Sequence, residues 1–278
     1  MLDTKSPPPS LKRIADRVAG LPEYMGYETQ LATLAWTLVQ IARSPAAAGL
    51  DRRWKTLALG FLDPSGWKEA PEVLEERLLT LYLRVHELTL PNRSEEHGIR
   101  RGVQGHSNYP GGILPLLLAG DHVGPETVSI DLGAGNGLQG ILLQRMYPHR
   151  ETIQVELLEG LIARGKAFQA AVGIPASRMT WRHANIAEVS LEGVDFVYLY
   201  RPAQPGGAGA EVYRAIARNL ARAPSHVVVF SVADCLGRFL GKGFRTCWTR
   251  GEVTCFRKRD AGGPGKPGNE ASNPLSRR

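Results

Sequence analysis

The sequence predicts an α/β fold in which a helical N-terminal region precedes a mostly parallel sheet. Three features of the 278 residues indicate this. Apolar residues recur at helical spacing within residues 11–105, and from residue 128 short apolar runs of strand length alternate with amphipathic segments. The last two runs, 244–248 and 253–257, are separated only by a short turn about Arg250-Gly251, which is typical of a hairpin.

Two hydrophobic patterns predict helices in the N-terminal region. Apolar residues between Leu31 and Ile41 follow the i, i+3, i+4, i+7 pattern, and a second such stripe begins after Pro71, a favourable first helical residue. We expect residues 11–105 to form a helical domain that packs on, or closes over, the domain that follows. Residues 1–10 are polar with three consecutive prolines and are expected to be disordered.

The composition of the chain limits where the protein is expected to act and which ligands it is expected to bind. Residues 1–10 contain no apolar stretch typical of a signal peptide, and the apolar run 31–41 is too short to span a bilayer. The three cysteines are scattered, without the spacing of metal ligands. These features predict a reduced, cytoplasmic chain with no membrane partner and no metal.

The first predicted strand, from Val128, leads into a glycine-rich turn. Its acid, Asp131, is followed by Gly133, Ala134, Gly135 and Gly137, and an apolar-periodic helix begins at once. Glycine adopts positive φ without strain and lets the backbone approach a ligand closely. The helix start offers unpaired N–H groups.

This motif resembles the first motif of class I S-adenosylmethionine-dependent methyltransferases, a strand ending in an acid followed by Gly-x-Gly-x-Gly. The resemblance covers roughly residues 106–258. It implies a Rossmann-like, three-layer α/β/α domain ending in an antiparallel hairpin, with S-adenosylmethionine as cofactor. The competing reading is a dinucleotide fingerprint on Gly135, Gly137 and Gly140. Asp131 disfavours it, because a carboxylate suits the cationic amino group and sulfonium of S-adenosylmethionine better than a pyrophosphate.

Further cofactor contacts are expected at the next two strand ends. Glu156 ends the second strand, nineteen positions after Gly137, where an acid can accept both ribose hydroxyls. Glu159, in the first turn of the next helix, is its competitor. After the third strand, 179–183, the resembled family often has an acid that accepts the adenine amino group. Here Asn185 stands at that point, and it is alternatively a helix cap, while Ile186 is expected on the adenine face.

The catalytic residues are expected where the fourth strand, 195–200, ends. Ligands of open α/β sheets lie beyond the carboxyl ends of strands, so Tyr200 and Arg201 are candidates to face the transferable methyl group. The alternative is that Tyr200 packs and Arg201 is solvated. Tyr109, in the segment before the first strand that closes over the methionine end in the resembled family, is a third candidate.

The methyl acceptor is poorly determined by the sequence. A faint resemblance of residues 109–112 and 200–202 to protein lysine methyltransferases favours a protein side-chain amine, with RNA as the main alternative and a small molecule also open. A catalytically silent binding module is the remaining alternative. Net charge is +7, concentrated after residue 126, yet Arg214, Arg218 and Arg222 read as a solvated helix face and 259–278 as a disordered basic tail.

Overall fold

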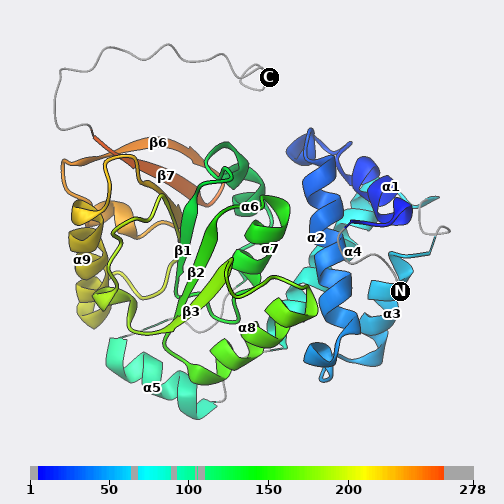
Figure 1. The fold of residues 1–278 in the computed structure, drawn as a ribbon, viewed down its shortest axis with the longest axis horizontal. Helices are drawn as coiled ribbons and strands as arrows, with labels where there is room; N and C mark the ends of the chain where they lie inside the picture. Colours follow the sequence, from blue (N-terminus) through cyan, green and yellow to red (C-terminus); the bar gives the residue numbers. More distant parts are fainter. Residues whose placement is uncertain (1–5, 64–67, 89–92, 104, 106–109, 260–278) are drawn as a thin grey trace.

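The computed structural model describes residues 6–63, 68–88, 93–103, 105 and 110–259. Within them, seven strands form one sheet in the order β3-β2-β1-β4-β5-β7-β6 (Figure 1). The strands are β1 (Val128–Leu132), β2 (Glu151–Glu156), β3 (Met179–His183), β4 (Phe196–Tyr200), β5 (Val228–Val232), β6 (Phe244–Arg250) and β7 (Val253–Lys258).

The strand directions confirm the predicted fold class. β1 to β5 are parallel, whereas β7 lies antiparallel between β5 and β6 and forms the expected hairpin with β6. A dinucleotide-binding sheet has the order 3-2-1-4-5-6, so the inserted antiparallel strand sets this sheet apart. The order turns back at β1 and β4, and their carboxyl ends therefore frame the crevice where a ligand is expected.

Helices cover both faces of the sheet. One face packs against α6 (Leu114–Leu118), α7 (Leu138–Met146) and α8 (Glu159–Ala171), in an apolar cluster that includes Phe196 and Phe230. The other face packs against α9 (Gly207–Arg222), whose stripe Val212, Ile216 and Leu220 is buried as its periodicity predicts. Between β3 and β4 the chain makes only the 3₁₀ turn η5 (Ile186–Glu188).

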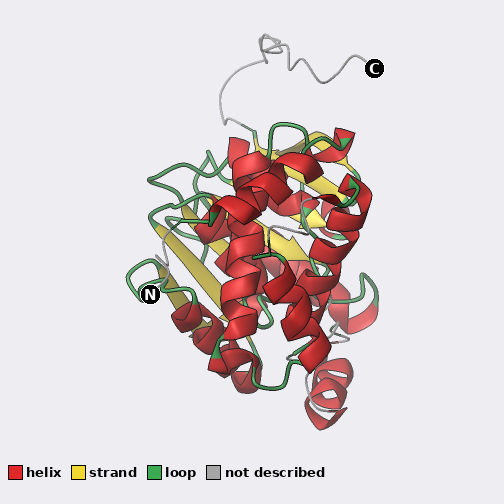
Figure 2. Cartoon of the chain, turned by 90° about the vertical axis from the view of Figure 1, so that its right-hand side faces the viewer, coloured by secondary structure: helices red, strands yellow, loops and turns green. Residues whose placement is uncertain are grey.

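Four N-terminal helices form a further layer outside α7 and α8. They are α1 (Pro9–Val18), α2 (Glu28–Arg43), α3 (Arg52–Gly60) and α4 (Pro71–Glu87), whereas α5 (Arg93–Val103) lies apart from them and contacts α9 (Figure 1). α2 is the centre of this layer, because it contacts α1, α3 and α4 on one side and α7 and α8 on the other. Figure 2 shows these helices in front of the sheet. None of the described helices is long and apolar enough to cross a bilayer.

Lys258, at the end of β7, is bound to the end of α9. Arg257 and Lys258 belong to β7, and the Lys258 ammonium donates to the carbonyl oxygens of Ala221 (2.7 Å) and Ala223 (2.6 Å). Lys258 thus binds the C-terminal carbonyls of α9, where a cation is favoured by the helix dipole. Residues 1–5 and 260–278, most of the two segments expected to be disordered, lie outside the described residues.

Candidate functional site

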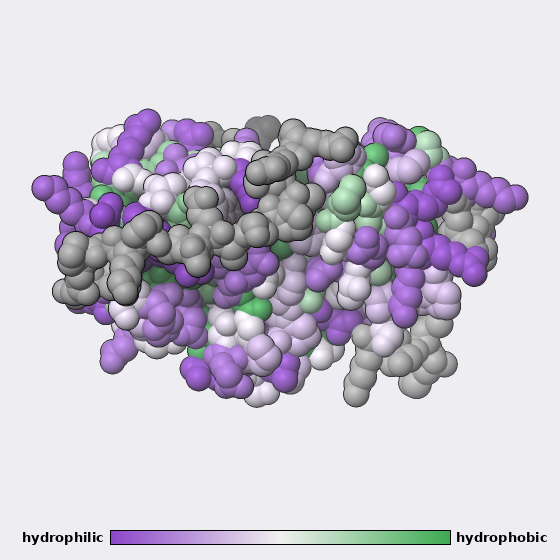
Figure 3. All heavy atoms as spheres, turned by 90° about the horizontal axis from the view of Figure 1, so that it is seen from above, coloured by the Kyte–Doolittle hydropathy of each residue, from purple (hydrophilic) through white to green (hydrophobic). Residues whose placement is uncertain are grey.

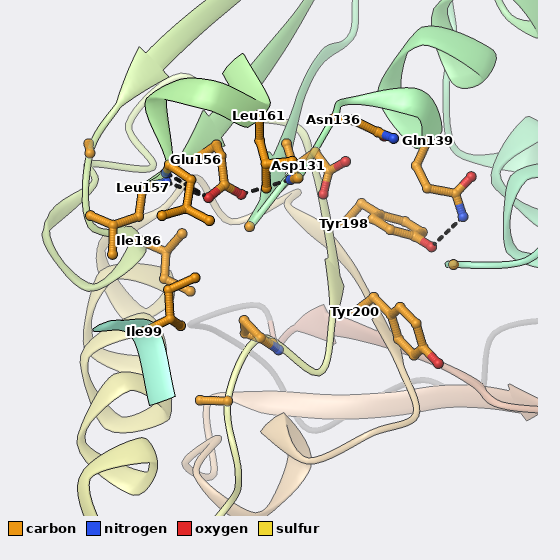
Figure 4. Close-up of a pocket in the computed structure, with 18 of the residues that line it drawn as sticks. Ile99, Asp131, Asn136, Gln139, Glu156, Leu157, Leu161, Ile186, Tyr198 and Tyr200 are labelled. Carbon is orange, nitrogen blue, oxygen red and sulfur yellow. Dashed lines mark hydrogen bonds between the residues drawn. The ribbon is translucent and has the colours of Figure 1, made fainter. Parts of the chain in front are cut away.

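A large cavity opens at the carboxyl ends of β1, β2 and β4, with an empty volume of about 1050 Å³ that includes open solvent. Seven of the predicted cofactor residues line it: Asp131, Gly133, Ala134, Gly135, Glu156, Asn185 and Ile186. Tyr200 lines it too (Figure 4).

The glycine turn owes its shape to backbone bonds and positive φ angles. The amides of Gly133 and Ala134 both donate to the Val155 carbonyl, at 3.0 and 2.9 Å, which holds the turn against β2. φ is +86° at Gly133 and +57° at Gly135, values that other residues rarely adopt. The turn therefore presents bare backbone to the cavity.

Glu156 fastens this turn from the next strand. One carboxylate oxygen, Oε2, accepts from the Gly135 amide at 2.8 Å, and the other, Oε1, accepts from the amides of Leu157 (2.8 Å) and Leu158 (2.9 Å). Burial raises the pKa of this carboxyl, and the three amide bonds oppose the rise. The competitor Glu159 is exposed in the first turn of α8 and does not line the cavity.

Asp131 is the buried charge of the site. Its side chain is 5% exposed, faces the cavity in Figure 4, and receives no hydrogen bond from any described residue. Burial, together with the nearby Glu156 carboxylate, raises the pKa of Asp131 to about 8. A buried carboxyl without a partner is costly to ionise, so this position favours a cationic ligand group.

The apolar end of the cavity lies beyond Glu156. Leu157 is 44% exposed, unusual for a leucine that follows a buried strand, and Figure 4 shows Ile186 and Ile99 of α5 close to it. Together they form an apolar slot suited to a flat aromatic ring. Asn185 acts as the cap of η5, since its Oδ1 accepts from the Ala187 amide at 3.0 Å, as the alternative reading of this residue proposed.

A buried polar network, which the sequence did not indicate, shapes the end of the cavity opposite the apolar slot. Gln139 of α7 donates from Nε2 to the Gly112 carbonyl (3.0 Å) and to the Tyr198 hydroxyl (3.1 Å), and the Gly112 amide donates to the Tyr82 hydroxyl of α4 (3.0 Å). A Cβ on Gly111 would lie 2.0 Å from Gln139 Nε2, so only glycine allows this approach. The network fixes Gly111 in the cavity wall.

α4 also holds the glycine turn directly. The Asn136 side chain donates from Nδ2 to the His86 carbonyl (3.0 Å) and accepts from the Leu138 amide (3.1 Å). His86 itself lines the cavity. No local sequence pattern indicated these contacts, because they join residues 27 to 59 positions apart.

Of the predicted catalytic residues, one lines the cavity and another does not. Tyr200 lines the cavity, whereas Arg201 does not: its guanidinium donates to Gln204 Oε1 at 3.3 Å, and its backbone takes the unusual φ of +30°. Pro202 and Ala203 contribute to the wall in its place. Tyr109 lies outside the described residues.

Gly137 also differs from its predicted cofactor role. It does not line the cavity but caps α7 with φ +69°, and a Cβ there would lie 2.3 Å from the Trp181 ring. Close packing between α7 and β3 therefore explains this glycine. Among the described residues no group of three or more His, Cys, Asp or Glu side chains has the arrangement of a metal site.

Comparison with known proteins finds similar folds but no close relative. No protein-family model matches the sequence, and no curated protein matches it. Several solved structures similar to this chain are methyltransferases. TrmN from Thermus thermophilus is 16% identical, with a TM-score of 0.42 and 69% of each chain covered. An rRNA methylase from Streptococcus thermophilus is 11% identical, with a TM-score of 0.42, covering 53% of this chain and 95% of that one.

A geranyl diphosphate methyltransferase in complex with GPP and sinefungin is 17% identical, with a TM-score of 0.36. The match covers 42% of this chain and spans less than half, 44%, of that protein. Similarity at these levels extends to the general fold, so the function has to be inferred from the site itself.

Proposed function

We propose that this protein is an S-adenosylmethionine-dependent methyltransferase that binds its cofactor in the cavity at the ends of β1, β2 and β4. One observation carries the proposal: a buried carboxyl without a partner, Asp131, stands beside a glycine turn that Glu156 fastens to β2. The cofactor's methionine end carries a cationic amino group and a sulfonium, which supply the missing positive charge.

The remaining lining fits the other parts of the cofactor. Oε2 of Glu156 accepts only one amide, which leaves an acceptor site for a ribose hydroxyl. The slot formed by Leu157, Ile186 and Ile99 is apolar, as an adenine ring requires. When bound, the cofactor supplies an activated methyl group. The protein then has to orient the acceptor and exclude water, because positioning lowers much of the barrier to such a transfer.

The lining favours an amine as the acceptor, in the form of a protein side chain. The described residues around the cavity include two carboxyls, Asp131 and Glu156, and neither lysine nor arginine. Such a cavity attracts a cationic ammonium and repels a phosphate. The hydroxyls of Tyr198 and Tyr200 lie at the end away from the apolar slot (Figure 4), where the acceptor nitrogen is expected.

Two measurements test the proposal in sequence. Calorimetric titration should show S-adenosylhomocysteine binding that is much tighter than any NAD binding, and Gly135→Val should abolish it by filling the turn. Tritium transfer from labelled S-adenosylmethionine to cell extract should then give a protease-sensitive product. Tighter binding of NAD would overturn the cofactor assignment. A nuclease-sensitive product would replace the protein amine by RNA, and binding without any transfer would leave a silent binding module.

A further inference from the structure

The β6–β7 hairpin gathers three arginines on one face of the sheet. Arg245 lies directly opposite Arg257, Trp248 lies opposite Cys255, and Arg250 lies opposite Val253. Directly paired residues share a face, and Val253, Cys255 and Arg257 alternate along β7 on the side of the cluster that includes α6 and α7. Arg245, Trp248, Arg250 and Arg257, which we call the hairpin face, therefore point the same way.

The pairing of Arg245 with Arg257 does not stabilise the sheet. Like charges directly opposite one another on neighbouring strands destabilise a sheet, and Arg245 and Arg257 form such a pair. All three arginines are exposed, and none has a carboxylate of a described residue within 4.0 Å. Asp121 lies close enough to act on the His122 ring but makes no ion pair with them.

Two of the three arginines of α9, Arg214 and Arg222, provide the contrast. Arg214 is paired with Glu211, and Arg222 donates to the Asn219 side chain at 2.7 Å. Each therefore has a partner on its own helix, as expected of a solvated face. The unpaired charge of the hairpin face is not explained in this way.

Flat rings lie among the hairpin arginines. The His122 ring stacks on Trp248, with centroids 6.2 Å apart and planes 19° apart, and Arg257 donates to His122 Nδ1 at 3.1 Å. Arg250 lies over the Trp248 ring, 5.7 Å from its centroid. Burial and the Arg257 charge both lower the pKa of His122, and the Asp121 charge opposes them. Trp248 and His122 are each partly exposed.

From these observations we propose that the hairpin face binds a single-stranded nucleic acid, with Arg245 and Arg257 on its phosphates and Trp248 against a base. Guanidinium groups pair with phosphates in fork geometry, and bases stack on aromatic side chains whatever their sequence. A bound phosphate also relieves the repulsion between Arg245 and Arg257. An acidic peptide supplies the charge but makes no use of the rings.

The face is placed to deliver such a strand toward the cavity. Arg250 is five residues from Arg245, roughly 15 Å along β6, enough for several phosphates. The turn at Gly251 touches Leu114, with 3.5 Å between Leu114 Cδ2 and a Cβ placed on that glycine. Leu114 follows the Gly111-Gly112 wall of the cavity by two residues. Figure 3 looks down on the side of Figure 1 where β6 and β7 lie, and hydrophilic residues are spread widely over that side.

Binding at this face does not depend on the methyl-transfer proposal, because it is measured without cofactor. The probe is a fluorescein-labelled oligouridylate of about twelve nucleotides, titrated by anisotropy with the full chain at several salt concentrations. The test variant is Arg245→Gln with Arg257→Gln. The matched control is Arg214→Gln with Arg222→Gln, which removes the same charge from α9.

We expect the hairpin variant to bind at least tenfold more weakly, and its plot of log K against log salt to be flatter by about 1.4. The α9 variant should stay within about twofold of wild type. Trp248→Leu should weaken binding by about fivefold or more. The hairpin variant should melt no lower than wild type, because the substitution removes a like-charge pair, so lost binding cannot come from misfolding.

Three outcomes would overturn the proposal. The first is equal binding by the hairpin variant and wild type, and the second is equal loss in the hairpin and α9 variants. The third is displacement of the oligonucleotide by polyglutamate at the same charge concentration, which would assign the face to acidic peptides. If the proposal holds while no methyl transfer is found, only the enzymatic proposal fails. If both hold, nucleic acid becomes the second candidate for the methyl acceptor.

Discussion

Glu156 offers the sharpest test of the site, because its carboxylate has two duties that can be separated. Oε1 accepts two amides, from Leu157 and Leu158, and Oε2 accepts one, from Gly135. A carboxylate has about four acceptor positions, so one remains for a ribose hydroxyl. The bidentate ribose pair expected from the sequence is therefore reduced to one strong bond.

The substitution Glu156→Gln tests this reasoning. The amide oxygen of glutamine can keep the bonds from Leu157 and Leu158, but its NH₂ group then faces the Gly135 amide, donor against donor. One hydrogen bond to a charged acceptor contributes about 1.5–3 kcal/mol, so the Kd for S-adenosylhomocysteine should rise by about 10- to 150-fold. Loosening of the turn adds to this loss.

The assay is calorimetric titration with S-adenosylhomocysteine, accompanied by thermal unfolding of the ligand-free protein. Glu159→Gln is the control, since Glu159 is exposed on α8 and outside the cavity wall. It should change the Kd by less than about twofold. If Glu156→Gln binds as tightly as wild type, or if the two variants come out reversed, the ligand does not contact Glu156 and the assigned orientation is wrong.

Three further predictions follow from single contacts. Because the pKa of Asp131 is raised from 3.8 to about 8, wild-type cofactor affinity should fall up to about tenfold per pH unit below pH 8. Between about pH 4 and pH 8 the native state holds a proton that the unfolded chain releases, so the stability of the ligand-free protein should fall as the pH rises through this range. Scanning fluorimetry across pH should show this fall in stability, and calorimetry should show the change in cofactor affinity. Both pH dependences should be weaker in Asp131→Asn. Tyr82→Phe removes the acceptor of the Gly112 amide, which should speed hydrogen exchange there and lower the unfolding free energy by about 1–3 kcal/mol, with cofactor Kd changed less than about threefold. Gly137→Ala should destabilise more in urea unfolding than Gly173→Ala, because both have φ near +70° but only Gly137 would push its Cβ against a neighbouring ring; equal losses would show that backbone strain alone matters.

The parts of the fold that depend on local pattern were predictable. Strand boundaries agree with the sequence expectation to within about two residues, because buried parallel strands are short apolar runs flanked by turn residues. The glycine turn and Glu156 were found for the same reason, since their spacing is local. Arg201 does not line the cavity, in line with the alternative that the sequence left open for this residue.

The site residues that could not be predicted are those whose contacts lie far away in the sequence. Gln139 looked like an ordinary polar residue of a helix, and only the fold brings it to Gly112 and Tyr198. The hairpin face was missed in the same way. His122 lies 126 positions before Trp248 and reaches it only through the fold, so no local pattern indicated their contact.

Two hydrogen bonds of α4 indicate what the N-terminal helices do at the site. Its residue Tyr82 accepts from the Gly112 amide in the segment that forms the cavity wall, and its residue His86 accepts through its carbonyl from Asn136 in the glycine turn. A lid that opens and closes would have to break these buried bonds in every cycle, leaving a backbone amide and a side-chain amide unsatisfied at a cost of about 1–3 kcal/mol each. The last turns of α4 are better understood as a fixed wall, so the site belongs to both halves of the chain. Entry of the cofactor and the acceptor must then depend on segments other than α4.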